Sequence, residues 1–336
     1  MIISTIIPVY NASLFLDKCI NSLLNAQIDG VANEIILVND GSLDNSLAIC
    51  ERYAAEHRNV KVFSQTNQGP SAARNLGIEK SQGAYITFVD SDDYVAKDYF
   101  KVLLSATEDY PAADIIIFGY YKVHDDKRKN EFFSVDNFDK MIHDYQIKQL
   151  LLNTMENNFL LFPVNKLYRK KLITDGNSFP FNLRLGEDSI FNLSQFYNAQ
   201  AIVFKEKSVY NYYNNPLSVT SVTYKPALTK QMEEHFQTKL NFYLSKVDLN
   251  NPRYFCDLAH INLEKTFYAL LANSLARKDV KLVEELKSIR DTKLIEFGFE
   301  NLNLKEIKKV QSRLILYLLK YRFYFLLKLL IKIKYD

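Results

Sequence analysis

The stretch YITFVDSDDY, residues 85–94, joins a short apolar strand directly to a group of acidic residues. Residues 85–89 have the aromatic and β-branched composition of a buried strand. The acidic cluster that follows is Asp90, Ser91, Asp92 and Asp93. Carboxylates crowded at the end of a buried strand repel one another unless a cation or solvent compensates for their charge. The cluster therefore predicts a divalent metal site, and a solvated capping turn is the alternative.

Upstream of this stretch, short β-branched runs alternate with amphipathic segments. The predicted strands cover residues 2–9, 34–39 and 60–64, and the predicted helices cover residues 14–26, 47–56 and 72–80. This alternation is typical of an α/β fold with a parallel sheet. Sheets of this type bind ligands at the carboxyl ends of their strands, so we expect the functional site at that edge.

Polar residues gather where the first three predicted strands end. They are Asn11 after the first, Asn39, Asp40, Gly41 and Ser42 after the second, and Asn67, Gln68 and Gly69 after the third. Each of them also fits a turn or a helix cap. Neither G-x-G-x-x-G nor G-x-x-x-x-G-K-[ST] occurs, so phosphate has to be neutralised by metal and side chains. Arg74, in a helix that opens near the same edge, is a candidate, and a surface helix charge is its alternative interpretation.

Downstream of the acidic cluster, the pattern changes twice. After a predicted strand at 114–121, residues 123–161 are polar and irregular, and the charge run 125–129 predicts a solvated insertion over the sheet. A helix at 189–198 and a strand at 201–213 follow. Beyond Pro226 the pattern is helical almost throughout. We therefore expect a catalytic domain over residues 1–225 and a helical region over residues 226–336.

Composition excludes several classes of protein. With 336 residues and 48% hydrophobic content, the chain can bury a full core. A formal net charge of +3 gives no global field that would favour nucleic acid as a partner. Three scattered cysteines fit neither a disulfide framework nor zinc-ligand spacing, which favours a reducing, cytoplasmic compartment. The first residues fit a strand rather than a signal peptide, and no stretch has the uncharged length of a membrane span.

Residues 308–335 carry eight Lys or Arg residues and no acidic residue. On a single helix, Lys309, Arg313, Lys320, Lys328, Lys332 and Lys334 would share one broad face with Tyr317, Tyr321 and Tyr324, opposite Ile315, Leu318, Leu319, Phe325, Leu326, Leu329, Leu330 and Ile333. Such a helix predicts a peripheral contact with anionic lipids at the inner face of the cell membrane. A helix packed on its own domain or on another subunit is the alternative.

Four blocks of sequence, residues 7–11, 38–42, 67–77 and 88–93, resemble in order and spacing the inverting family 2 glycosyltransferases of the GT-A fold. The likeness covers roughly residues 1–220. It implies an α/β fold with a Rossmann-like mixed sheet flanked by helices, to which the helical C-terminal region is an extension. It also implies a hexosyltransferase-type enzyme (EC 2.4) that moves a sugar from a nucleotide-diphosphate donor, most commonly a UDP-sugar, with Mn²⁺ or Mg²⁺ as cofactor. The acceptor would be a hydroxyl of a glycan or lipid-linked glycan in surface polysaccharide assembly.

The resemblance assigns roles at the strand ends. Pro8 and Tyr10 would line the nucleobase pocket, and Asp40 would bind the uracil or ribose. Arg74 would help hold the base. Asp92 would ligate the metal together with Asp90, which also faces the ribose. The full candidate donor-binding set is Pro8, Tyr10, Asn11, Asp40, Asn67, Arg74, Asp90, Ser91, Lys166 and Ser218.

Two members of this set match the family less closely. Lys166 stands in Asn165-Lys166-Leu167-Tyr168, where it would offset phosphate charge, although an amphipathic strand edge explains it almost as well. Ser218 stands in a segment that resembles the one closing over the diphosphate. Relatives often carry a basic residue at the position of Asn214, and its absence here puts the phosphate role of that segment in doubt.

The motif Gly186-Glu187-Asp188-Ser189-Ile190-Phe191 resembles the family's E-D motif at the start of a helix. Inverting transfer needs a base that takes the proton of the acceptor hydroxyl. Asp188 is the predicted base, and Glu187 is the second candidate. Without the resemblance, both would be acids that stabilise the first turn of a helix.

Two rival functions can be stated from the sequence. A sugar nucleotidyltransferase would need a Gly-rich, basic loop after the first strand, and residues 8–11 are not one. A non-catalytic, membrane-docked glycan-assembly module would keep the fold without turnover. The acidic residues Asp90, Asp92 and Asp188 argue against such a module.

Overall fold

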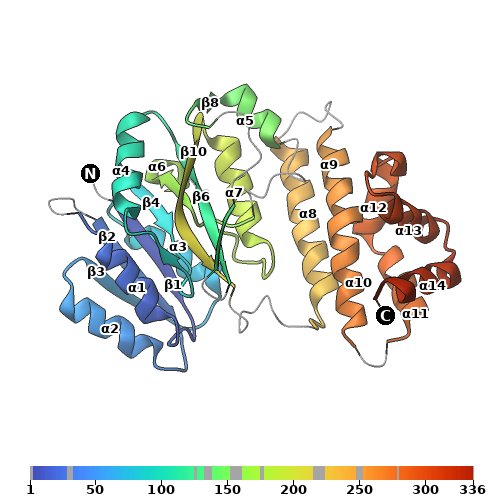
Figure 1. Cartoon of the computed structure of the whole chain (residues 1–336), viewed down its shortest axis with the longest axis horizontal. Coiled ribbons are helices and arrows are strands. Elements are labelled where there is room, and N and C mark those ends of the chain that lie inside the picture. Colours follow the sequence, from blue (N-terminus) through green and yellow to red (C-terminus); the bar gives the residue numbers. More distant parts are fainter. Residues whose placement is uncertain are drawn as a thin grey trace. The chain divides into compact units, whose positions relative to one another are not determined.

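The computed structural model describes residues 3–28, 33–124, 127–131, 138–151, 161–174, 178–214, 224–246, 253–277 and 280–335. The described residues divide into two compact units, one up to residue 214 and one from residue 224. The first unit is built of strands and helices, and the second is helical (Figure 1). We propose that the boundary between the catalytic domain and the helical region lies between residues 225 and 226, as predicted.

The first unit contains the following elements. Its strands are β1 (Ile3–Val9), β2 (Asn33–Asp40), β3 (Val60–Gln65), β4 (Tyr85–Phe88), β5 (Tyr94–Val95), β6 (Ile115–His124), β7 (Lys127–Glu131), β8 (Met141–His143), β9 (Lys166–Arg169) and β10 (Ala201–Tyr213). Its helices are α1 (Leu16–Asn25), α2 (Ser46–Glu56), α3 (Pro70–Lys80), α4 (Tyr99–Asp109), α5 (Asp144–Leu151), α6 (Lys170–Thr174) and α7 (Glu187–Asn198).

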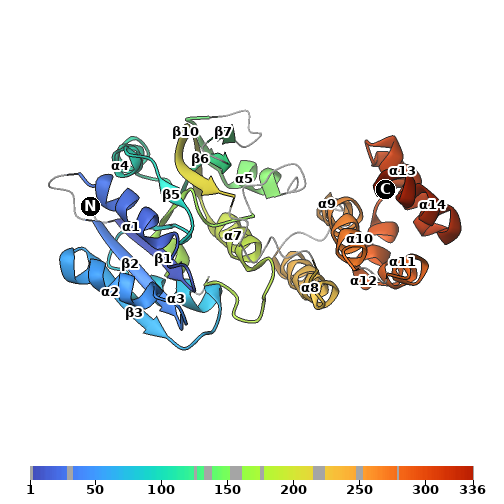
Figure 2. The ribbon, with the colours of Figure 1, turned by 60° about the horizontal axis from the view of Figure 1, so that its bottom comes forward.

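Over the described residues these strands form one mixed sheet in the order β3-β2-β1-β4-β9-β6-β10-β5. Strands β3, β2, β1 and β4 are parallel neighbours. Strand β9 runs antiparallel to both β4 and β6. Strand β10 runs parallel to β6 beside it (Figure 2). Strand β7 pairs with β6, and β8 pairs with β10. The expected α/β fold with a mixed sheet and flanking helices is confirmed.

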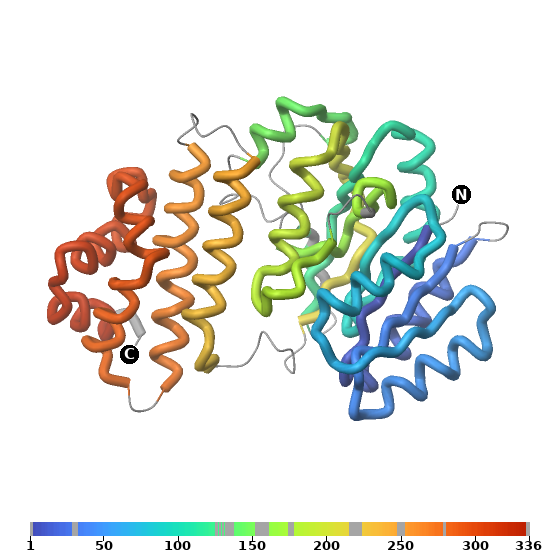
Figure 3. Tube along the Cα trace, turned by 180° about the vertical axis from the view of Figure 1, so that it is seen from behind, coloured from blue at the N-terminus to red at the C-terminus, as the bar shows by residue number. Residues whose placement is uncertain are grey.

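The parallel half of the sheet is covered on both faces. Strands β1 and β2 are almost entirely buried, as expected for parallel strands with helices on both sides. Helices α1 and α2 lie on one face and α3 lies on the other (Figures 1 and 3). This arrangement follows from right-handed crossovers, because the strand order reverses direction between β3 and β4. The reversal places the carboxyl ends of β1 and β4 at the switch point of the sheet.

The expectation of an irregular insertion over residues 123–161 is wrong for its described part. Strand β6 continues to His124, β7 pairs with it in antiparallel register, and β8 and α5 follow. The predicted solvated loop at 125–129 is therefore replaced from Lys127 onward by a strand. A polar strand at the border of a sheet lacks the apolar run by which buried strands are recognised.

The second unit contains α8 (Leu228–Lys246), α9 (Arg253–Ile261), the π-helix η3 (Asn262–Thr266), α10 (Phe267–Leu275), α11 (Leu282–Arg290), α12 (Lys293–Asn301), the 3₁₀ turn η4 (Leu304–Glu306), α13 (Val310–Lys320) and α14 (Tyr324–Tyr335). Helices α8 and α9 pack through Tyr243 and Tyr254, whose ring centroids lie 5.3 Å apart. None of the described helices has the length and apolar character needed to cross a bilayer.

The prediction of one continuous helix over residues 308–335 is wrong. Helix α13 ends in a Schellman-type turn, in which Phe323 N–H donates to the Leu318 carbonyl over 2.9 Å and Arg322 N–H donates to the Leu319 carbonyl over 3.2 Å. Arg322 adopts the left-handed conformation at φ 63° that this turn requires. Glycine usually occupies that position, so the sequence carries no signal for the break.

Candidate active site

Helix α3 lies unusually close to β1, and this contact sets the position of the site. A Cβ atom added at Gly77 would lie 2.4 Å from Ile6 Cγ2, so only glycine fits against the strand. Pro70 occupies the first turn of the helix, where its missing N–H costs no hydrogen bond. The close packing brings Arg74, one turn before Gly77, onto the edge of the sheet where β4 ends.

Arg74 is the centre of the site. Its side chain is only 5% exposed, and its guanidinium donates to Asp90 Oδ1 over 3.0 Å and to Asp188 Oδ1 over 2.8 Å. The Oε1 atom of Glu187 lies 3.9 Å from the same guanidinium. Burial lowers the pKa of Arg74, but Asp188, Asp90 and Glu187 raise it by more, so that the group stays charged. One buried cation therefore joins the acidic cluster after β4 to the E-D motif of α7.

Asp188 stands in the first turn of α7, which begins directly after Gly186 in the left-handed conformation at φ 77°. Burial raises the pKa of Asp188 to about 7, against the opposing effect of Arg74. Glu187 and Asp90 contribute to the rise, and Lys166 opposes it. A carboxyl group with a pKa near neutrality is suited to general base catalysis.

The loop before α7 is fixed by a residue that the sequence did not single out. Asn75, next to Arg74 on α3, donates from Nδ2 to the carbonyl of Phe179 and accepts from its N–H at Oδ1, both over 2.9 Å. The Phe179 ring stacks on Phe191 of α7 with centroids 3.8 Å apart. The Arg74 guanidinium lies 5.3 Å from the Phe179 ring. Helix α3 thus positions α7 through Asn75 as well as through Arg74.

The acidic cluster divides into one buried member, Asp93, and three half-buried members. Asp93 is 2% exposed, and its carboxylate accepts from the Tyr210 hydroxyl over 2.5 Å and from Tyr213 N–H over 2.7 Å. Burial and the neighbouring Asp90 and Asp92 raise the pKa of Asp93 well above its usual range. Its oxygens are used to attach β10, which leaves them little capacity for a metal.

The residues present fit a Mg²⁺- or Mn²⁺-dependent diphosphate site of the usual kind. Asp90 and Asp92 are half-buried, and their negative charge adds to the effect of burial in raising the pKa of Asp93. Across the described residues, no group of three or more His, Cys, Asp or Glu side chains is arranged to hold a metal. Magnesium sites typically use one or two protein carboxylates and take the remaining ligands from water and substrate phosphates. Asp90 and Asp92 match that donor set.

Asp40, at the end of β2, holds the loop that precedes α3. Its carboxylate accepts from Gln68 N–H over 2.9 Å, from Gly69 N–H over 2.8 Å and from Gln65 Nε2 over 2.8 Å. Asn67 donates from Nδ2 to the Asp40 carbonyl over 3.1 Å. A carboxylate has about four acceptor positions, so Asp40 has little capacity left for a ligand.

The remaining predicted residues differ in their surroundings. Tyr10 is 48% exposed just beyond β1, and Asn11 accepts from Leu43 N–H over 2.8 Å. Pro8 and Ser91 are half-buried. Ser218 lies outside the described residues.

Lys166 lies in the interior of the protein. Its Nζ donates to the Phe162 carbonyl over 2.8 Å and to Asn165 Oδ1 over 3.2 Å. Burial lowers the pKa of Lys166 to about 7, against the opposing effect of Asp188. The charge of Lys166 in turn lowers the pKa of Asp188. Its ammonium group is bonded to buried protein oxygens, which does not support the expected role in binding phosphate.

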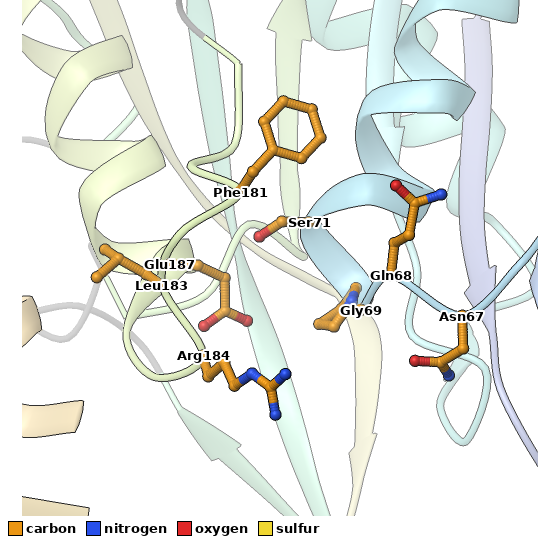
Figure 4. Close-up of a pocket in the computed structure, with 9 residues that line it drawn as sticks. Asn67, Gln68, Gly69, Ser71, Phe181, Leu183, Arg184 and Glu187 are labelled. Carbon is orange, nitrogen blue, oxygen red and sulfur yellow. The ribbon is translucent and has the colours of Figure 1, made fainter. Parts of the chain in front are cut away.

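A pocket of about 340 Å³ lies between the start of α3 and the segment before α7 (Figure 4). It is lined by Asn67, Gln68, Gly69, Pro70, Ser71, Phe181, Leu183, Arg184 and Glu187. Arg184 and Glu187 approach from one side, and Gln68 and Gly69 face them from the other. Phe181 is 70% exposed and offers an aromatic surface among amide and charged groups. The pocket has the size and mixed polarity of a small-molecule site.

Comparison with known proteins gives a consistent result. The model of the family described as Glycosyl transferase family 2 matches residues 4–176. The chain is 33% identical over 341 residues to the uncharacterized glycosyltransferase EpsJ of Bacillus subtilis, covering 98% of this chain and 95% of that protein. It is 31% identical over 216 residues to a poly(ribitol-phosphate) beta-glucosyltransferase of Bacillus spizizenii, covering 63% of this chain and 32% of the relative.

The fold also recurs in known structures. TarS residues 1–349 of S. aureus in complex with UDP-GlcNAc match with a TM-score of 0.63 and 20% identity, covering 98% of this chain and 90% of that one. The mannosyltransferase PcManGT of Pyrobaculum calidifontis, in complex with GDP-Man and Mn²⁺, matches with a TM-score of 0.53 and 11% identity, covering 96% of this chain and 85% of that one. The chain belongs to glycosyltransferase family 2 and is a hexosyltransferase-type enzyme (EC 2.4).

Proposed function

We propose that this family 2 enzyme transfers a sugar, with inversion, from a nucleotide-diphosphate donor to a hydroxyl of a glycan or lipid-linked glycan in surface polysaccharide assembly. A UDP-sugar is the preferred donor, since the TarS structure carries UDP-GlcNAc. The PcManGT structure carries GDP-Man, so a GDP-sugar is the second donor to be tested. Family membership favours this proposal over a sugar nucleotidyltransferase or a non-catalytic assembly module.

The observation that carries the proposal is the link that Arg74 makes between Asp90 and Asp188. The donor half and the acceptor half of a transferase must be held together, because the attacking hydroxyl and the leaving diphosphate meet at one carbon. Arg74 contacts both carboxylates within 3.0 Å and has almost no exposed surface of its own. It therefore fixes the spacing between the two halves of the site.

In the proposed reaction, the acceptor oxygen attacks the anomeric carbon on the face opposite the diphosphate. The bond between that carbon and the diphosphate oxygen breaks, and the proton of the acceptor hydroxyl passes to the carboxylate of Asp188. The pKa of about 7 suits this step, since the group is substantially ionised near neutral pH and still accepts a proton readily. Glu187, 3.9 Å from Arg74, remains the second candidate for the base.

Asp90 and Asp92 are the proposed ligands of Mn²⁺ or Mg²⁺. When bound there, the cation supplies positive charge that stabilises the diphosphate leaving group. The carboxylate of Asp90 is already oriented by Arg74. Pro8, Tyr10, Asn11, Asn67, Arg74, Asp90 and Ser91 remain the proposed donor-binding residues. Asp40, Lys166 and Ser218 remain in the set without support from the described contacts.

We assign the pocket beside Glu187 to the sugar end of the reaction. Its exposed Phe181 ring can stack against the apolar face of a pyranose, and its amide and charged side chains suit hydroxyl groups. We propose that the reaction takes place in the cytoplasm at the inner face of the cell membrane.

The test is a screen of UDP-, GDP- and dTDP-sugars with Mn²⁺, read by release of the nucleoside diphosphate. We expect one donor to be hydrolysed slowly without an acceptor, with hydrolysis reduced on the order of 100-fold in Asp92→Asn. Asp109→Asn, at an exposed position of α4, is the matched control and should retain hydrolysis. Failure of every donor would contradict the proposed function. If Asp188→Asn transferred sugar to a proven acceptor at the unchanged rate, the assignment of the base would be wrong.

A further inference from the structure

Helix α14 turns an apolar face toward solvent. Its exposed residues Phe325, Leu326, Leu329 and Ile333, here called the α14 apolar face, are 71%, 51%, 46% and 81% exposed. The same helix packs against its own unit through Tyr324, Leu327 and Ile331, which are at most 9% exposed. The predicted place of Tyr324 on the basic face is wrong, because Tyr324 is buried, whereas Leu326, Leu329 and Ile333 of the predicted opposite face are exposed.

Positive charge borders this face. Successive residues of an α-helix are rotated by about 100° around its axis. With this rotation, the four residues of the α14 apolar face span an arc of about 100° around the axis, and Lys328 and Lys332 lie beside one edge of that arc. Lys332 is exposed and Lys328 is half-buried. Lysine next to an outward apolar arc is the arrangement of a helix that lies in the headgroup region of a membrane.

The neighbouring turn and helix extend the same character. Tyr321 and Phe323, in the turn between α13 and α14, are 61% and 55% exposed. Leu314 and Val310 of α13 are 49% and 74% exposed. Aromatic residues of this kind are enriched where proteins meet the membrane interface. The apolar surface is thus not confined to one helix.

A second copy of the chain or a lipid surface would cover an apolar face of this kind, and charge decides between the two. From residue 307 to residue 335 the chain has eight Lys or Arg side chains and no Asp or Glu. A second copy of the chain would bring the same positive charge against it, and like charges facing each other oppose association. An anionic lipid surface has the complementary charge, and attraction grows with each Lys or Arg that reaches it.

We propose that α14 lies in the plane of an anionic membrane surface, with Phe325, Leu326, Leu329 and Ile333 inserted among the lipids and Lys328 and Lys332 at the headgroups. The binding is peripheral and reversible. It is independent of the proposed reaction, since none of these residues belongs to the candidate active site, and loss of one leaves the other intact.

The chain contains no tryptophan, which allows a direct test. Phe325→Trp places a single tryptophan on the α14 apolar face of the full chain. Leu244→Trp, on α8 at 46% exposure, is the matched control. With phosphatidylglycerol vesicles we expect a blue shift of the Phe325→Trp emission and quenching by lipids brominated in the acyl chain. The control should show neither, and pure phosphatidylcholine vesicles should produce neither.

Vesicle flotation then measures how much each group contributes. Lys328→Gln with Lys332→Gln should weaken binding to phosphatidylglycerol vesicles about twenty-fivefold, at about fivefold per lysine. Leu329→Gln with Leu326→Gln should weaken it at least about tenfold, and Leu244→Gln should not change it. If a variant failed to fold, salt titration of the unchanged chain would still decide, because binding must fall as screening increases.

Three outcomes would overturn the proposal. One is the absence of binding or of a blue shift with anionic vesicles. Another is equal binding to neutral vesicles, which would remove the role of the lysines. The third is a blue shift without vesicles that grows with protein concentration and coincides with dimers in sedimentation velocity, which would make the face a contact between copies.

Discussion

The guanidinium of Arg74 and the carboxylate of Asp188 form a 2.8 Å ion pair across 114 positions of the sequence. The same guanidinium holds Asp90, and both contacts come from a side chain that is 5% exposed. An arginine can make two such contacts at once because its donors form a rigid planar fork. A lysine presents a single ammonium group and cannot span both carboxylates.

Arg74→Lys should therefore lower kcat/KM by at least about 100-fold, although charge is conserved. The cause is the loss of the fixed spacing between Asp90 and Asp188. Steady-state kinetics with the identified donor and acceptor measure the effect. Arg52→Lys, on α2 with a half-exposed side chain, is the control and should be neutral. Near-normal activity of Arg74→Lys would show that spacing through Arg74 is not needed.

The pH dependence of activity follows from Asp188. Burial raises its pKa to about 7, so the base form accumulates, and kcat/KM rises, as the pH increases through about 7. Asp188→Asn should abolish this limb together with most of the activity. A rate that is flat between pH 5.5 and 8.5 in the unchanged enzyme would contradict the assignment.

A stability measurement checks the same pKa without turnover. Because the folded-state pKa lies above the usual value of 3.8, folding favours the protonated form. The stability contributed by Asp188 is complete below the unfolded pKa and is lost as the pH rises through about 7. Asp188→Asn should therefore gain stability relative to the unchanged chain between pH 5 and pH 8, as followed by urea unfolding. Parallel stability curves would show that the pKa is not raised.

Much of the fold could be predicted, because its signals are local. The strand predicted at 201–213 coincides with β10, and those at 2–9 and 34–39 agree with β1 and β2 to within a residue or so. Strand β9 has only four residues, and its partners lie more than forty positions away, so its place between β4 and β6 was not predictable from periodicity. The break at Arg322 was missed because the left-handed residue is not glycine.

The sequence motifs of the site could be predicted one by one, but the contacts between them could not. Asp90, Arg74 and Asp188 each stand in a recognisable block, but nothing in the sequence says that Arg74 bonds to both acids. The two hydrogen bonds between the Asn75 side chain and the Phe179 backbone could not be predicted, because the sequence shows only that Asn75 stands beside Arg74. The burial of Lys166 among carbonyls also depends on tertiary packing, which a charged residue in a short strand does not reveal.

We expect substitution of Asp92 to change the Mn²⁺ requirement of the enzyme more selectively than substitution of Asp90. Asp92→Asn removes a ligand charge without disturbing the pair between Asp90 and Arg74, so we expect a loss of donor hydrolysis on the order of 100-fold and a higher Mn²⁺ requirement. Titration of Mn²⁺ against donor hydrolysis, after treatment with a chelator, measures both. An unchanged Mn²⁺ titration curve in Asp92→Asn would place the metal elsewhere.

The closeness of α3 to β1 predicts an unusual effect of a conservative change. Gly77→Ala would improve helix propensity by about 1 kcal/mol, which alone would stabilise the chain. The added Cβ, however, would lie 2.4 Å from Ile6 Cγ2, in a buried strand that is fixed between β2 and β4. Overpacking of this kind costs about 1–3 kcal/mol and more where the neighbour cannot move, so we expect net destabilisation.

A double-mutant cycle tests whether the contact with Ile6 causes the destabilisation expected of Gly77→Ala. Ile6→Ala removes both Cγ atoms that the new Cβ would meet, at a cost of about 2–5 kcal/mol as a cavity in the core. In the Ile6→Ala background, Gly77→Ala should become neutral or stabilising, because only its helix propensity remains. Chemical unfolding of the four chains gives the coupling energy. If Gly77→Ala destabilised both backgrounds equally, Ile6 would not be what keeps position 77 glycine. Activity should fall in Gly77→Ala alone, since any displacement of α3 carries Arg74 away from Asp90 and Asp188.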